Sequence, residues 1–209
     1  MYKNMACTSK DEDMNFEINT QTNTDMKAKT NTNTDVKAFL KRCIKPGQRY
    51  VVMGIGSTLR SDDGVGIYFI EQLSRTVQQD NMLRDNILLI AGSTAPENFT
   101  GEIKTFTPST LFIVDAACMG LTPGETKIIP ASDISGVSFS THMMPLSVLL
   151  NYLEAEIGCN VVFIGIQPES TEPGFSISED VKKGAELLAK EFSFAFVHYL
   201  TRRTSLDNR

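Results

Sequence analysis

Two adjacent carboxylates, Asp62 and Asp63, follow an apolar run and a glycine-rich turn in this chain. The apolar run covers residues 51–56 and ends in Gly-Ile-Gly, and an amphipathic segment follows over residues 65–77. This order predicts a buried parallel strand, a tight turn and a helix. In open α/β sheets ligands bind at the carboxyl ends of the strands, so we expect the two acids to stand where chemistry takes place.

The glycine pattern differs from the common phosphate-binding loops. A dinucleotide fingerprint needs a third glycine where Leu59 stands, and a P-loop needs a Gly-Lys-Ser/Thr sequence that does not follow here. Carboxylates at positions 62 and 63 would also repel a pyrophosphate. The turn is therefore predicted to place acids near a cationic group.

Asp115 and His142 are the other candidates for this site. Asp115 interrupts the apolar segment 111–117 near its carboxyl end, and His142 stands at the start of a predicted helix. If the sheet is parallel, these residues converge with Asp62 and Asp63. Two carboxylates and an imidazole suit a divalent ion such as nickel, zinc or iron, and three protein ligands leave positions open for substrate or water.

Each candidate also has a purely structural interpretation. Asp62 and Asp63 suit the N-cap or first turn of the following helix. Hydrogen bonds from loop amides would satisfy Asp115, and a histidine at a helix start is commonly a cap or surface residue. His142 stands out because the chain has only two histidines, and the other one, His198, lies within an apolar helical pattern.

Composition excludes several classes of protein. The net charge is -5 with no basic stretch, which argues against a nucleic-acid partner. No apolar run has transmembrane length and the N-terminus lacks a signal-peptide pattern, so no membrane insertion is expected. The four cysteines form no Cys-x-x-Cys pair, which argues against a zinc ribbon and fits a reduced, cytoplasmic setting.

Alternating patterns predict an α/β fold, with a mostly parallel sheet and helices on both faces. Residues 1–34 are rich in Thr, Asn, Asp and Lys and predict a disordered polar tail, whereas 35–209 predict a single domain. Asp35 is the expected cap of a first short helix, and either Ser176, in a capping box with Glu179, or Ser178 is the expected cap of the last one. The expected strands are 49–56, 86–91, 110–116, 125–130 and 161–167, and the other expected helices are 63–79, 97–105, 143–157 and 179–200.

Over about residues 50–192 the chain resembles the [NiFe] hydrogenase maturation endopeptidases, most closely the branch that serves formate-hydrogenlyase-type hydrogenases (hydrogenase 3). The resemblance rests on several motifs in the family's order. One departure is Ser57, where the family usually has Asn. The motifs are Gly54-x-Gly56-x-x-Leu-x-x-Asp-Asp63-Gly-x-Gly66, Gly92-Ser-Thr-Ala-Pro-Glu-Asn98, Ile113-Val-Asp-Ala-Ala-x-Met-Gly-Leu-x-Pro-Gly-Glu125, Thr141-His-x-Met-Pro-Leu146 and Phe163-Ile-Gly-Ile-Gln-Pro168.

The resemblance implies a three-layer α/β/α sandwich and an endopeptidase activity. The expected reaction removes the C-terminal extension of a [NiFe] hydrogenase large-subunit precursor after nickel insertion. The family's metal-contacting and catalytic residues match Asp63, Asp115 and His142. The expected metal is nickel carried by the precursor, bound weakly or not at all by the free protein.

Two other classes of function stay open on the sequence. The chain could be a non-catalytic docking factor that checks nickel during hydrogenase maturation. It could also be a small-molecule metallohydrolase with a metal of its own. Within the peptidase hypothesis, the sequence does not separate a metal-assisted reaction from an aspartate-type reaction in which Asp63 or Asp115 acts as base.

Overall fold

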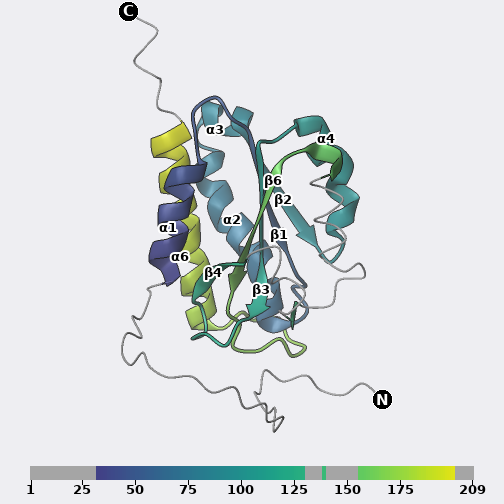
Figure 1. Ribbon diagram of the computed structural model, residues 1–209. Coiled ribbons are helices and arrows are strands. Elements are labelled where there is room, and N and C mark those ends of the chain that lie inside the picture. The colour runs from purple at the N-terminus through teal and green to yellow at the C-terminus, as the bar shows by residue number, and fades with distance from the viewer. Residues whose placement is uncertain (1–31, 130–137, 140–154, 201–209) are drawn as a thin grey trace, which may run out of the picture.

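The computed structural model describes residues 32–129, 138–139 and 155–200. Five strands form one sheet in the order β2-β1-β3-β6-β4, and a short sixth strand, β5, pairs with β3 (Figure 1). β1, β2, β3 and β6 are parallel, whereas β4 runs antiparallel to β6 and β5 antiparallel to β3. The strands are β1 Tyr50–Ile55, β2 Ile87–Ser93, β3 Thr110–Cys118, β4 Thr126–Ile129, β5 Ser138–Phe139 and β6 Asn160–Ile166.

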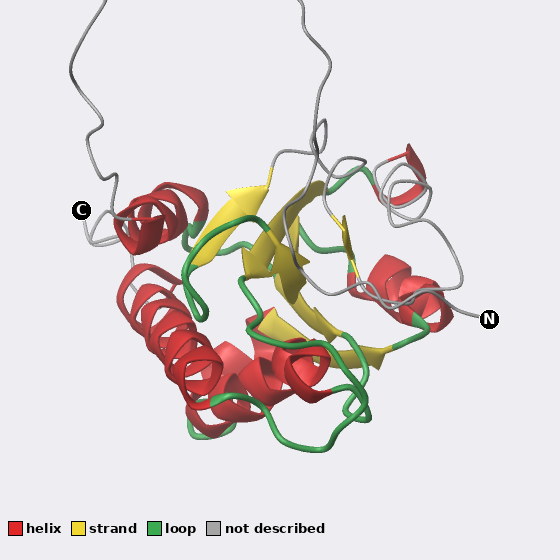
Figure 2. Cartoon of the chain, turned by 90° about the horizontal axis from the view of Figure 1, so that it is seen from below, coloured by secondary structure: helices red, strands yellow, loops and turns green. Residues whose placement is uncertain are grey.

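Helices cover both faces of this sheet, which confirms the predicted three-layer α/β fold (Figure 2). α1, α2 and α6 pack on one face, and α4 packs on the other. The α-helices are α1 Thr32–Cys43, α2 Val65–Val77, α3 Asn81–Asn86, α4 Thr100–Phe106 and α6 Glu179–Ala195. Single turns precede α2 and α4, η1 Ser61–Gly64 and η2 Pro96–Phe99, and the π-helical turn η4 Phe196–Leu200 continues α6.

Alternate side chains of the two central strands enter different core clusters. On β1, Val52 packs toward α2 and α6, whereas Val51 and Met53 belong to the cluster with Ile103 of α4. The same alternation continues on β3, where the odd-numbered residues face α4. Both strands are buried on both faces, which is why each reads as an apolar run rather than an alternating pattern.

The first helix begins earlier than predicted, whereas the last one begins at the predicted residue. α1 begins at Thr32, so residues 32–34 are helical and do not belong to the predicted tail, and Asp35 lies inside the helix rather than capping it. Local preferences locate helix ends only to within a residue or two, and here Val36 and Leu40 anchor the helix in the core. α6 begins at Glu179, as predicted, and Ser178 occupies its N-cap position, which excludes the alternative capping box at Ser176.

Some expectations concern parts of the chain outside the described residues. Residues 1–31 and most of the predicted helix 143–157 lie outside, although residues 155–157 are helical. Across the described ranges, none of the helices combines the length and apolar character needed to cross a membrane.

Candidate functional site

Asp63 is held in a buried turn between β1 and α2. Its side chain is fully buried, and its Oδ2 accepts a hydrogen bond of 2.8 Å from the backbone N–H of Ser57. Its Oδ1 is also buried and has no hydrogen-bond partner among the described residues. Buried carboxylate oxygens are normally hydrogen-bonded, so an acceptor without a partner in the described part of the chain makes Asp63 a candidate for binding a ligand.

The backbone N–H of Ser57, not its side chain, holds Asp63. A change of side chain at this position leaves that hydrogen bond in place. The Ser57 hydroxyl instead accepts a long contact of 3.4 Å from the N–H of Leu59 within the turn. The departure from Asn at this position therefore leaves the anchoring of Asp63 intact.

Gly56 lies close to both the backbone of Asp63 and the carboxylate of Asp115. Its φ is +123°, and a Cβ at this position would overlap the backbone carbonyl oxygen of Asp63. The same Cβ would lie 3.4 Å from Oδ1 of Asp115. Any residue with a Cβ would clash with the turn at this position. This steric limit explains why the motif requires a glycine as its second glycine.

Asp115 lies in β3, at the middle of the sheet, and is fully buried. Its Oδ1 accepts a hydrogen bond of 2.8 Å from the N–H of Ala116. The strand continues through Cys118, so Asp115 stands before the strand end at which the sequence placed it. The odd-numbered positions of β3 face the α4 layer, which puts Asp115 on that side of the sheet.

Asp62 has a structural role that separates it from Asp63. Its Oδ2 accepts hydrogen bonds from the N–H groups of Glu169 and Ser170, at 2.8 and 2.9 Å, and from the Ser178 hydroxyl at 3.0 Å. Its Oδ1 accepts a further bond of 2.6 Å from the N–H of Ser178, the N-cap of α6. All of these partners come from the segment between β6 and α6, so Asp62 fastens that segment to the turn.

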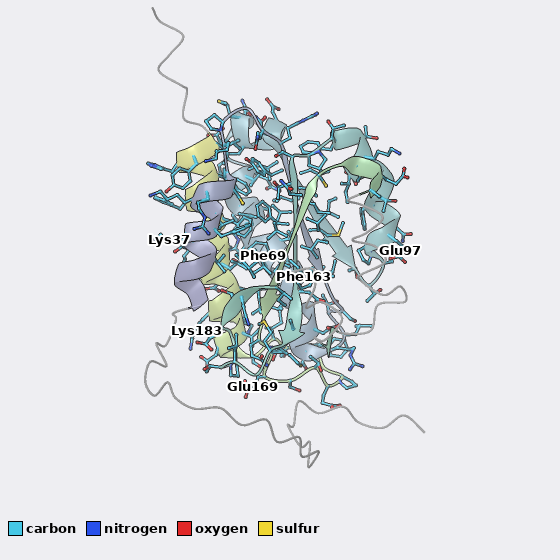
Figure 3. The ribbon with its side chains drawn as sticks, in the orientation of Figure 1. Lys37, Phe69, Glu97, Phe163, Glu169 and Lys183 are labelled. Atoms are coloured by element: carbon cyan, nitrogen blue, oxygen red, sulfur yellow. The ribbon has the colours of Figure 1, made fainter. Side chains whose placement is uncertain are left out.

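Sequence reasoning did not identify this connecting segment, residues 167–178, as part of the site. It lies at the edge of the sheet where β3 ends, as the position of Glu169 shows (Figure 3). Arg60 forms a parallel bridge with Gly174, and its buried Nε has no hydrogen-bond partner within the described ranges. No local motif predicts these contacts, because they join residues that are more than a hundred positions apart in the sequence.

His142 lies outside the described residues, so its predicted place beside the two acids stays a prediction. Within the described ranges, no group of three or more His, Cys, Asp and Glu side chains is arranged to hold a metal ion. The described part of the site thus consists of two buried acids on either side of Gly56, one of them with a vacant oxygen. Such a pair can bind a cation or accept a proton, but it needs further ligands to hold a metal.

The family model for hydrogenase maturation proteases matches residues 67–193 of this chain. This chain belongs to the hydrogenase maturation protease family. A putative hydrogenase maturation protease of Methanocaldococcus jannaschii is 37% identical over 155 residues, which cover 73% of this chain and 91% of the relative. The hydrogenase 3 maturation protease of Escherichia coli K12 is 35% identical over 137 residues, covering 65% of this chain and 83% of the relative.

Solved structures agree with this membership. The [NiFe] hydrogenase maturation protease HycI of Thermococcus kodakarensis superposes with a TM-score of 0.66 at 31% identity, covering 76% of this chain and 99% of that one. A crystal structure of the hydrogenase 3 maturation protease gives a TM-score of 0.59 at 33% identity, over 69% and 88% of the two chains. The resemblance seen in the sequence motifs, and the protease activity that it implied, are therefore confirmed.

Proposed function

We propose that this hydrogenase maturation protease removes the C-terminal extension of a [NiFe] hydrogenase large-subunit precursor after nickel has been inserted. The family membership and the similarity to hydrogenase 3 maturation proteases support this substrate class. The observation that carries the proposal is the buried Oδ1 of Asp63, which has no partner among the described residues and lies in the turn that approaches Asp115.

Nickel enters this proposal as part of the substrate. Asp63, Asp115 and His142 contact the ion already seated in the precursor, which supplies the remaining ligands. The buried Oδ1 of Asp63 has no donor among the described residues, and a cation brought by the substrate compensates the charge of this carboxylate. Cleavage then depends on whether the metal is present, so the protease distinguishes a loaded precursor from an empty one.

Hydrolysis of the peptide bond places the oxygen of a water molecule on the carbonyl carbon and delivers a proton to the leaving amine. The vacant Asp63 Oδ1 suits either of two roles in this step. As a nickel ligand it makes cleavage depend on metal. As a general base it takes the proton from the attacking water, and cleavage of an empty precursor then becomes possible.

The test is the intact mass of the precursor after incubation with the protease. Nickel-loaded and nickel-free precursors are compared with wild type, with Asp63→Asn and with the matched control Asp85→Asn, an exposed acid on α3. We expect wild type and the control to release a short C-terminal peptide from the loaded precursor only, and Asp63→Asn to release none. Unchanged mass of both precursors with wild type would favour a docking factor, and cleavage by Asp63→Asn at the wild-type rate would remove Asp63 from the site.

A further inference from the structure

Two of the most exposed large apolar side chains in the described part of the chain stand beside the acidic turn. Phe175 is 86% exposed and Leu59 is 62% exposed. Leu59 belongs to the turn between Gly56 and Asp63, and Phe175 belongs to the segment between β6 and α6. Exposed aromatic and aliphatic side chains that gather next to a site commonly mark a binding surface.

The backbone brings these two side chains together. The N–H of Gly174 donates to the carbonyl oxygen of Leu59 at 3.0 Å, and the N–H of Ser61 donates to the carbonyl oxygen of Gly174 at 2.8 Å. These bonds form the parallel bridge between Arg60 and Gly174. Leu59 and Phe175 therefore belong to two backbone segments that are hydrogen-bonded to each other, and each residue is the neighbour of one member of the bridged pair.

The surface is held firmly despite its exposure. Asp62 accepts hydrogen bonds from Ser170, on one side of Phe175, and from Ser178, on the other. Both ends of the short Phe175 segment are thus tied to the turn that carries Asp63. A preorganised apolar surface loses little conformational freedom on binding, which favours its use for recognition.

We propose that Leu59 and Phe175, with the exposed Pro173 two residues before Phe175, form a docking patch for an apolar stretch of the precursor that adjoins the cleaved bond. This inference rests on the proposed function. The position of the patch selects this occupant: the N–H of Asp63 donates to the carbonyl oxygen of Arg60 at 2.9 Å, so the patch is continuous with the turn that presents the acid. A polypeptide that reaches Asp63 from this side lies across Leu59 and Phe175.

The test uses the full-length protease and its precursor. The dissociation constant for nickel-free precursor and the kcat and KM for nickel-loaded precursor are measured for wild type, Leu59→Ser, Phe175→Ser and the double variant. The matched control is Leu187→Ser, an exposed leucine on α6. Burial of one such side chain at an interface corresponds to about a 10- to 100-fold change in affinity. We expect Kd and KM to rise by about that factor in Phe175→Ser and further in the double variant, with kcat unchanged.

The outcomes separate this inference from the function on which it rests. If the double variant binds the precursor as tightly as wild type does, the docking patch is excluded whether or not cleavage occurs. If wild type binds but does not cut loaded precursor, the proposed function fails, and the dissociation constants of the variants still decide the patch. If wild type neither binds nickel-free precursor nor cuts loaded precursor, both are excluded; if it cuts loaded precursor without binding the empty one, the KM values of the variants decide the patch. Dimers of wild type that the double variant cannot form would assign the patch to self-association instead. Because both side chains are exposed, unchanged thermal unfolding of the variants is the expected check of folding.

Discussion

The adjacent acids Asp62 and Asp63 should respond to the same substitution in opposite ways. Replacing either by Asn keeps the size of the side chain and removes its charge. Asp62 uses both carboxylate oxygens, with one donor at Oδ1 and three at Oδ2. Asp63 uses only Oδ2, because its Oδ1 has no partner in the described part of the chain. The chemistry of the two positions therefore differs although the residues are identical.

Asp62→Asn should destabilise the fold. The amide of Asn retains one acceptor oxygen, so its NH2 group must face at least one of the donors, the partly buried N–H of Ser178 in the best arrangement. A lost hydrogen bond to a charged group costs about 1.5–3 kcal/mol, and the unsatisfied donor adds to this. We expect a loss of about 2–4 kcal/mol in the free energy of unfolding. For a domain of this size, that corresponds to a fall of about 4–16 °C in the unfolding midpoint.

Asp63→Asn should leave stability almost unchanged. The Asn carbonyl oxygen can keep the bond from the Ser57 N–H, and its NH2 group takes the place of an oxygen to which none of the described residues donates. Removal of a buried charge offsets any small loss of packing, so the free energy of unfolding should change by less than about 1 kcal/mol. Processing of loaded precursor should nevertheless be lost.

Thermal unfolding followed by circular dichroism, together with the mass assay of precursor processing, measures both effects. Processing by Asp62→Asn is tested well below its own unfolding midpoint, where we expect the folded protein still to cut. Equal destabilisation by the two variants, or a stable Asp62→Asn protein that cannot process precursor, would refute the division of roles argued from the hydrogen bonds.

Further predictions concern the turn, the histidine and the first helix. Gly56→Ala should lower the free energy of unfolding by more than about 3 kcal/mol and abolish processing, because the new Cβ would overlap the carbonyl oxygen of Asp63. Thermal unfolding measures the loss of stability, and the mass assay measures the loss of processing. His142→Ala should abolish processing while the unfolding midpoint stays near that of wild type, and a fully active variant would exclude the ligand role. Deleting residues 1–31 should leave processing and stability unchanged. Deleting residues 1–44 should lower the free energy of unfolding by about 5 kcal/mol or more, because α1 and the residue after it bury three aliphatic side chains. Urea titration measures both effects.

The fold was predictable where burial controls the pattern. The central strands β1 and β3 are covered on both faces, so their sequences are continuous apolar runs bounded by turn residues. The elements that the sequence missed are the short helix α3 and the short strand β5. β5 has only two residues and depends on pairing with the end of β3, which a local pattern does not reveal. The six residues of α3 are too few to produce a helical period.

The separation of Asp62 from Asp63 shows what a local pattern cannot supply. Both acids follow the same turn, both are fully buried, and either residue type suits the first turn of a helix. Only the segment before α6, more than a hundred residues further along the chain, distinguishes them, because it donates four hydrogen bonds to Asp62 and none to Asp63 among the described residues. The family motif selected Asp63 without giving this reason. The hydrogen bonds supply it: the carboxylate of Asp62 joins two parts of the fold, and Asp63 is the acid of the pair with an oxygen that none of the described residues engages.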